Sequence, residues 1–276
     1  MNRNYTTEAV VLKTRRFGDF HKSVIILSPE FGIIEATAHG AYKGRSRLSS
    51  ITDPFCVSVF DLYHNPVKDV WKINGCESRV INSRIRENLH AMYNASFWSE
   101  LILKSHASGA DFRNVYPLYT DALDFLEKNN NRGTSATIHF LYRFLINSGF
   151  ITDFTECGHC GAALGSGAAS AEPQARRRDS GAALGSGAGS RGGTLSFSPV
   201  EGCFLCPSCG STGLPCLSYE DALYLQDSLS LHLAEAAGKR LDLRTEKEIR
   251  NMLLAVLKSI IDTPLNTLDY IDYGME

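Results

Sequence analysis

The sequence lacks a long uninterrupted apolar run. Its opening segment, MNRNYTTEAVVLKTRR, has no apolar core of the kind found in secretory signals. The later apolar stretch Met252–Ile261 is too short to cross a bilayer and contains Lys258. We therefore expect a soluble cytoplasmic protein without a membrane partner. In that reducing compartment, the eight cysteines are expected to be metal ligands and buried thiols, because disulfides are rare there.

A strong net charge is also lacking, since 28 Lys and Arg nearly balance 30 Asp and Glu. This excludes a protein that is basic all over, but it allows a local basic patch that binds nucleic acid. Residues 1–80 hold 11 Lys and Arg against 8 Asp and Glu. The positive charge is concentrated between Lys13 and Arg47, where seven basic residues face three acidic ones.

The usual catalytic signatures are missing as well. The sequence has no H-E-x-x-H and no G-x-S-x-G, and the segment Gly40–Ser46 lacks the residue order of a phosphate-binding loop. We therefore expect no enzymatic activity. Two alternatives stay open at this point: a zinc-containing RNA- or DNA-modifying enzyme whose barrel presents the substrate, and a scaffold that contacts only proteins.

Residues 1–80 alternate between strand-like runs and turns, which predicts five short strands. The expected strands are Glu8–Lys13, Ser23–Ser28, Ile33–Ala38, Phe55–Tyr63 and Val67–Ile73. Five short strands of this kind favour a small barrel, with the OB fold as the first choice. A five-stranded sandwich or an SH3-like barrel would give a similar pattern.

From residue 81 the apolar period changes to about 3.6, which predicts a second, α-helical domain over 81–276. Stripes of apolar residues predict helices beginning near Ile85, Val115 and Ile138. Thr245 and Glu248 form a predicted capping box at the start of a last helix. The expected fold class is therefore α+β, with an N-terminal OB barrel followed by a helical domain.

A low-complexity insert interrupts the helical region at 165–193. The sequence GAALGSGA at 161–168 is repeated at 181–188. Gly, Ala and Ser bury too little apolar surface to offset their ordering entropy, so we expect a disordered segment. Its Arg176–Arg178 run could contact phosphates, although a simply solvated run is favoured.

Two C-x-x-C-G motifs, at 157–160 and 206–209, carry the strongest chemical signal. Their thiolates are typical zinc ligands, and the following glycine permits a left-handed turn that directs N–H groups at sulfur. The 45 residues between Cys160 and Cys206 are too many for a four-cysteine site, but without the insert 16 remain, inside the usual spacing of about 15–20. We therefore predict a zinc site formed by Cys157, Cys160, Cys206 and Cys209.

This zinc would be structural, because four thiolates leave no open coordination position. Cys203 and Cys206 form an alternative pair. Only the pair Cys206–Cys209 is followed directly by a glycine, as the C-x-x-C-G motif requires. His159, between two ligands, is expected to be exposed. Cys56 and Cys76 lie in strand-like surroundings and are expected to be core thiols.

A second signal is a set of basic residues beside aromatic ones. Lys13 to Lys22 would lie in the first inter-strand loop, and Lys43 to Arg47 in a loop after the third strand. Phe17, Phe20 and Tyr42 are interleaved and could stack on bases. The predicted DNA-binding residues are Arg15, Arg16, Lys22, Lys43, Arg45 and Arg47, with Lys13 beside them.

Taken in order, these segments resemble the RecO family, the bacterial recombination mediators of the RecF pathway. The resemblance is carried by VVLKTRRFGDF, HKSVIILSPEFG, IIEATAHGAYKGRSR and the late pair of C-x-x-C motifs, and it covers nearly the whole chain apart from 165–193. It implies an N-terminal OB domain and zinc within a helical domain, with the family's zinc positions on the same four cysteines and a DNA-binding surface that includes Arg15, Arg16, Lys43 and Arg47.

The resemblance also implies a function. Members of this family bind single- and double-stranded DNA, anneal complementary strands, act with RecR and bind the acidic, hydrophobic C-terminal tail of single-strand-binding protein. In doing so they help to load RecA onto coated strands, in the cytoplasm and in association with the nucleoid. The groove for the tail has no clear sequence signal; Arg143, between Leu141 and Leu145, is a candidate for its basic rim.

Overall fold

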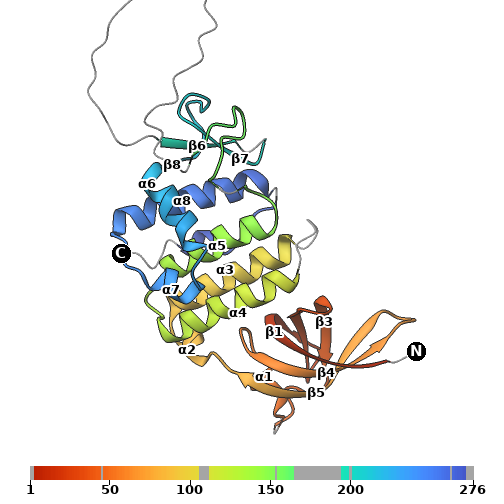
Figure 1. Cartoon of the computed structure of the whole chain (residues 1–276). Coiled ribbons are helices and arrows are strands. Elements are labelled where there is room, and N and C mark those ends of the chain that lie inside the picture. Colours follow the sequence, from red (N-terminus) through yellow and green to blue (C-terminus); the bar gives the residue numbers. More distant parts are fainter. Residues whose placement is uncertain are drawn as a thin grey trace, which may run out of the picture.

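The protein has a β-barrel at one end, a layer of helices in the middle and a small sheet at the other end (Figure 1). This computed structural model describes residues 3–44, 46–105, 112–152, 154–164, 194–198, 201–261 and 263–271. The predicted insert 165–193, including Arg176–Arg178, lies outside the described residues, and so does Arg45.

The barrel is closed, with strand order β1-β2-β3-β5-β4. Its elements are β1 (Asn4–Phe17), β2 (His21–Ser28), β3 (Gly32–Ala38), α1 (Leu48–Ile51), β4 (Val57–Asn65) and β5 (Val70–Val80). This is the five-stranded arrangement expected of an OB fold, so the predicted barrel is confirmed. Alternate residues such as Val24, Ile26, Ile34 and Ala36 face inward and form its core.

The helical part is built from eight helices among the described residues. They are α2 (Ser83–Glu87), α3 (Leu89–Ser105), α4 (Phe112–Lys128), α5 (Gly133–Asn147), α6 (Tyr219–Ser228), α7 (Leu233–Gly238), α8 (Leu243–Ile260) and α9 (Leu268–Ile271). The predicted apolar stripes of α4 and α5 are buried, from Val115 to Leu126 and from Ile138 to Leu145. No helix in the described part of the chain is long and apolar enough to span a membrane.

A helix does begin near Ile85, as predicted, but two details of the helical part differ from the prediction. The stripe that begins at Ile85 is broken at Asn88, which has an extended backbone and accepts a hydrogen bond from the Ala91 N–H, so that a new helix begins at Leu89. The last helix begins at Leu243, because Asp242 caps it by accepting hydrogen bonds from the N–H groups of Arg244 and Thr245. Asp242 therefore takes the capping role that was predicted for Thr245.

A three-stranded sheet with order β7-β6-β8 stands beside the loops that carry the two C-x-x-C motifs. Its strands are β6 (Thr194–Ser198), β7 (Cys203–Leu205) and β8 (Cys216–Ser218). Phe197 and Phe204, whose ring centroids are 5.1 Å apart, belong to the same cluster of buried residues as the cores of the helices. Phe204 also contacts Phe154, with a centroid distance of 4.2 Å, which ties the sheet to the segment after α5.

One apolar core joins the outer face of the barrel to the helices. Leu12, Leu27 and Phe55 belong to the same cluster of buried residues as the cores of α3, α4 and α5. Polar contacts reinforce the junction: the Tyr116 hydroxyl donates to Glu8 at 2.9 Å, and the Asn82 side-chain amide donates to the Phe55 carbonyl at 2.9 Å. The division into domains at 1–80 and 81–276 stays a prediction.

Candidate metal centre and nucleic-acid interface

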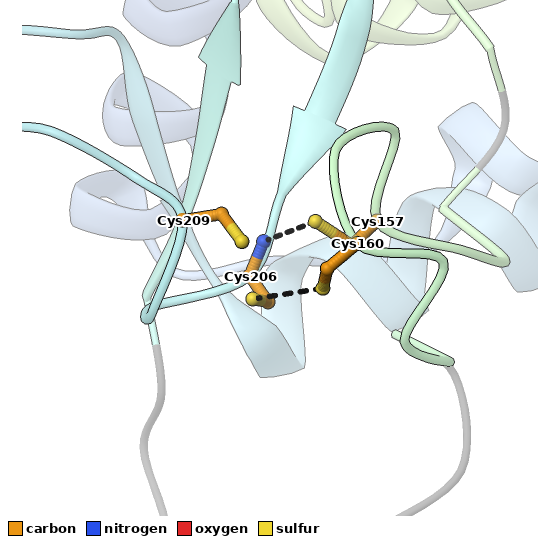
Figure 2. Close-up of side chains that lie close together, drawn as sticks. All are labelled: Cys157, Cys160, Cys206 and Cys209. Carbon is orange, nitrogen blue, oxygen red and sulfur yellow. Dashed lines mark hydrogen bonds between the residues drawn. The ribbon is translucent and has the colours of Figure 1, made fainter. Parts of the chain in front are cut away.

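Four cysteines from two loops meet at the end of the molecule opposite the barrel (Figures 1 and 2). Cys157 and Cys160 lie in the loop after α5, and Cys206 and Cys209 follow β7. Their Sγ atoms all lie within 4.8 Å of one another, and those of Cys160 and Cys206 are 3.8 Å apart. Tetrahedral zinc with Zn–S bonds of about 2.3 Å requires sulfur atoms about 3.8 Å apart, so the four thiols fit such an ion.

The two C-x-x-C-G turns, at 157–161 and 206–210 and called knuckles below, differ in the conformation of their glycines. Gly161 has φ +70° and its N–H donates to the Cys157 carbonyl at 2.8 Å, as the predicted left-handed turn requires. Gly210 makes the matching bond to the Cys206 carbonyl, also at 2.8 Å, but its φ is not positive. A Cβ at Gly210 would lie 2.7 Å from the Ser196 hydroxyl oxygen, so close packing against β6 requires this second glycine.

Hydrogen bonds prepare one thiol of the cluster to be a thiolate. Burial raises the pKa of Cys157, but the N–H groups of Cys206, Cys160 and His159 direct hydrogen bonds at its sulfur and lower the pKa to about 6. Cys209 shows the opposite direction, because sulfur contacts from Cys160 and Cys206 raise its pKa to about 12. Cys157 is thus prepared to be a thiolate, whereas Cys209 would lose its proton only on binding a cation, which would offset the repulsion among closely spaced thiolates.

Cys203 lies beside the cluster but does not belong to it. Its side chain is 6% exposed and packs against Gly158, and its Sγ lies 3.6 Å from a carboxylate oxygen of Glu201. The residues brought together are thus Cys157, Cys160, Cys206 and Cys209, the set chosen from sequence, and Cys203 is left out. His159 is exposed, and Cys56 is buried in the barrel core.

A β-bulge sets the direction of the basic residues on β1. The register with β2 shifts between Val11 and Lys13, so that Leu12 is an extra residue. After the bulge Arg15 pairs with Ser23 and Phe17 with His21 on the outer face, whereas Arg16 pairs with the inward-facing Lys22. The sequence placed Lys13 to Lys22 in a loop; in the structure Lys13, Arg15 and Arg16 belong to β1 and Lys22 to β2.

The exposed cations differ in how far they are already paired. Arg15 forms an ion pair with Glu35 at 2.6 Å, with side chains 65% and 51% exposed. The Arg16 guanidinium lies 5.8 Å from the centre of the Tyr42 ring. Lys43 and Arg47 are exposed, and within the described residues neither belongs to a salt bridge.

Lys22 requires a correction. Its side chain is 2% exposed, and its Nζ lies 2.8 Å from a carboxylate oxygen of Asp53 and 2.6 Å from the Ser49 carbonyl. Burial inside the barrel end keeps this charge from any phosphate on the surface. Lys22 is therefore not available as a DNA-binding residue and instead fastens the segment around α1 to β2.

Three exposed aromatic side chains accompany the cations. Phe17, Phe20 and Tyr42 are 50%, 51% and 41% exposed. The Tyr42 N–H donates to the Phe20 carbonyl at 3.1 Å, which holds the β1–β2 turn against the loop after β3. The turn with Phe20 and the loop with Tyr42, Lys43 and Arg47 thus meet, and the Arg16 guanidinium lies over the Tyr42 ring; cations near exposed aromatic rings are typical of single-strand binding. We call these six residues the barrel-end surface.

Arg143 does not form a free basic rim. Its guanidinium donates to the carbonyls of Ser228 and Leu231, at 2.5 Å and 3.0 Å. These carbonyls belong to the end of α6 and the link to α7, so Arg143 joins α5 to that turn. Burial lowers the pKa of Arg143.

Comparison with known proteins gives one consistent result over both parts of the chain. Residues 1–80 match the family model described as Recombination protein O N terminal, and residues 86–269 match Recombination protein O C terminal. A DNA repair protein RecO from Synechocystis sp. is 32% identical over 150 residues, which are 54% of this chain and 52% of the relative.

Further relatives carry the same name. The protein from Desulforamulus reducens is 30% identical over 58% of this chain and 61% of its own length. The protein from Rubrobacter xylanophilus is 25% identical over 91% of each chain. The chain thus spans about half of the Synechocystis relative and three fifths of the D. reducens relative, while the R. xylanophilus match extends over nearly all of both.

Proposed function

Because the chain belongs to the RecO family of DNA repair proteins, we propose that it is a recombination mediator of the RecF pathway. In this proposal it binds single- and double-stranded DNA, anneals complementary strands and performs no catalytic chemistry of its own. The observation that carries the proposal is the barrel-end surface, where exposed cations lie beside exposed aromatic rings on an OB barrel. The proposed role requires a cytoplasmic, nucleoid-associated location.

Annealing follows from the charge of this surface. Arg16, Lys43 and Arg47 neutralise phosphates of two strands at once and so lower the repulsion between them. Phe17, Phe20 and Tyr42 hold bases by stacking, which is indifferent to sequence. Base pairing then supplies the driving force. Arg15 contributes less than these cations, because it is paired with Glu35.

We propose that the four-cysteine cluster holds Zn²⁺ in a purely structural role. Such an ion joins the loop after α5 to the loop after β7 and completes its coordination with thiolates alone. Cys206 and Cys209 of the cluster follow β7, which lies at the end of the molecule opposite the barrel (Figure 1), so zinc is expected to stabilise the helical part without contacting DNA held by the barrel.

We further propose that RecR and the C-terminal tail of single-strand-binding protein are its partners, with RecA served indirectly. An acidic, hydrophobic tail needs cations beside exposed apolar side chains. A cleft of about 620 Å³ between the starts of α5 and α8 offers Lys247 next to Leu243, which is 79% exposed. Arg132 and Glu246 also line it, but the Arg132 guanidinium donates to the Gly238 and Lys239 carbonyls, so Lys247 is the main cation for the tail. This cleft is the docking site we propose for the tail.

The decisive experiment is annealing of complementary strands, bare or coated with single-strand-binding protein, in the presence and absence of RecR. We expect annealing of both bare and coated strands. An Arg16/Lys43/Arg47→Ala variant that keeps its melting temperature should anneal strands markedly less. If coated strands are not annealed even with RecR, the mediator role is wrong. Covalent change in labelled DNA or RNA during the same incubation would instead favour a modifying enzyme.

A further inference from the structure

A cleft of about 510 Å³ lies between the barrel and α3. Its lining comes from β1 (Leu12, Lys13 and Thr14), from Pro54 and Phe55 before β4, and from Met92, Ser96 and Leu103 of α3. The volume lies inside the range of about 300–1,000 Å³ that is typical of small-molecule sites. The cleft is thus large enough for an aromatic group with an apolar surface.

Two backbone irregularities shape this cleft. Leu12 is the extra residue of the bulge in β1, and Phe55 has φ +74°, a conformation rare for an aromatic residue. The two segments are joined by a hydrogen bond that the Phe55 N–H donates to the Val11 carbonyl at 2.8 Å. Both side chains are 3% exposed and line the cleft. Bulges and strained residues concentrate at binding sites, which indicates that this lining serves a ligand.

The rim of the cleft is positively charged. Lys13, Arg86 and Lys104 all line it, and Glu100 is the one carboxylate among its lining residues. Glu100 is fully occupied, because it pairs with Lys104 at 2.7 Å and accepts hydrogen bonds from the N–H groups of Asn266 and Thr267. Arg86 donates to the Pro54 and Ile81 carbonyls through one nitrogen, at 3.0 Å and 2.9 Å. A ligand with negative charge outside the cleft and an apolar, aromatic part inside would complement this site.

The cleft continues the barrel-end surface along one strand. On the outer face of β1, Phe17 is followed by Arg15 and then by Lys13, which is both exposed and part of the cleft lining. A single strand that leaves the aromatic platform can therefore follow this row of cations to the cleft. Ser96 and Asn266 add polar groups that can bond the edges of a base.

We propose that this cleft receives one nucleobase turned out of a DNA single strand that runs along the outer face of β1. The base packs on Leu12, Phe55 and Met92, while its flanking phosphates lie at Lys13 and Arg86. The inference rests on the proposed DNA-binding function and assigns it a second site. Holding one base out of the stack would fix the register of the strand without reading its sequence.

The experiment uses the full-length protein and a series of single-stranded oligonucleotides with 2-aminopurine at successive positions. A base drawn out of the stack fluoresces more strongly, so the enhancement should be confined to one position of the bound strand. Ser96→Trp fills the cleft without changing charge. We expect it to remove the enhancement and weaken binding about tenfold, the order of one lost base contact. Its matched control is Ser259→Trp, on the exposed face of α8. This substitution should change neither the fluorescence enhancement nor the DNA affinity.

The phosphate contacts give an independent readout. Lys13→Ala should reduce the slope of log affinity against log salt by about 0.7, whereas Ser96→Trp should leave that slope unchanged. If Ser96→Trp lowers the melting temperature, the smaller Ser96→Leu substitution takes its place.

The possible outcomes separate this site from the proposed function. Failure of the wild-type protein to bind DNA would overturn both. Normal affinity and normal fluorescence in a folded Ser96→Trp variant would overturn the cleft alone. Loss of binding of an acidic peptide in that variant, with DNA binding intact, would show that the cleft takes a peptide instead of a base.

Discussion

The ammonium group of Lys22 lies 2.8 Å from the carboxylate of Asp53, and the lysine side chain is 2% exposed. This pair joins β2 to the residues between α1 and β4. The Lys22 Nζ also lies 5.4 Å from the centre of the Tyr42 ring, so the same cation supports one of the exposed aromatic residues of the barrel-end surface. The loop with Lys43 and Arg47 is thus fastened to the barrel on its inner side.

Asp53→Ala is expected to destabilise the protein more than Lys22→Met. The first change leaves a buried charge without its counter-ion, whereas the second removes the charge and keeps an apolar stem of similar length. We expect Asp53→Ala to cost about 2 kcal/mol or more of unfolding free energy, the cost of a hydrogen bond to a charged group. Urea midpoints of both variants test this, and a larger loss in Lys22→Met would show that the pair itself stabilises the fold.

Glu35→Gln is expected to strengthen DNA binding. Glu35 holds the Arg15 guanidinium at 2.6 Å, so removing its charge releases a cation on the outer face of β1. The salt dependence of single-strand affinity should steepen by about 0.7, the contribution of one phosphate contact. Glu30→Gln is the matched control, because it makes the same charge change in the turn between β2 and β3. Equal effects of the two substitutions would mean that only net charge matters.

Removal of any one of the four clustered cysteines should remove the metal. Cys157→Ser, Cys160→Ser, Cys206→Ser and Cys209→Ser are expected to lose bound zinc, measured by elemental analysis, while Cys203→Ser keeps it. Loss of the ion should lower the melting temperature by about 5 °C or more, the effect of a few kcal/mol in a chain of this size. DNA affinity should persist at temperatures where the variants are folded. Loss of DNA binding at an unchanged melting temperature would contradict a purely structural ion.

The four clustered cysteines could be predicted from sequence because the C-x-x-C-G pattern is local and its chemistry restricts the choice. The rule that a glycine follows the second cysteine chose Cys209 over Cys203, and Cys209 does lie in the cluster, although Gly210 does not adopt the left-handed turn that Gly161 does. The role of Gly210 could not be predicted, because it depends on Ser196, a contact across the small sheet. The barrel was predictable for a similar reason, since alternation along each strand reports which face is buried.

The fate of individual cations could not be predicted from sequence. Lys22 follows a turn and looks like a surface residue until the ladder places it beside inward-facing neighbours. The bulge at Leu12 reverses the inward and outward faces of β1, and no residue type announces it. Arg143 sits on an amphipathic helix, but its partners are carbonyls 85 and 88 residues away in the chain. In each case the deciding contact is non-local.

Gly158→Ala should damage the metal centre although Gly158 is not a ligand. An added Cβ would lie 2.1 Å from the Sγ and 2.6 Å from the Cβ of Cys203, which is fixed in β7. We expect a loss of about 1–3 kcal/mol in stability, as for other overpacked sites, together with weaker zinc retention against a chelator. Gly238→Ala is the control, because nothing lies within 4 Å of its added Cβ. Equal zinc retention in both variants would show that the first knuckle can shift.

The carboxylate of Glu100 should make stability depend on pH in the acid range. Burial alone would raise its pKa, but hydrogen bonds from Lys104 and from the side chain and N–H of Thr267 outweigh it and lower the pKa to about 2. A folded-state pKa below the unfolded value of about 4.3 stabilises the protein above pH 4.3, and that stability is lost as the pH falls toward 2. The difference between the folded and unfolded pKa values corresponds to about 3 kcal/mol of unfolding free energy. Glu100→Gln should therefore be markedly less stable than the wild type at pH 7, and the gap in their urea midpoints should narrow at pH 3. Lys104→Met removes one of the stabilising donors and should move this acid transition to higher pH. If the gap between the urea midpoints of wild type and Glu100→Gln stays constant from pH 7 to pH 3, the charge of Glu100 does not fasten the Asn266–Thr267 segment to α3.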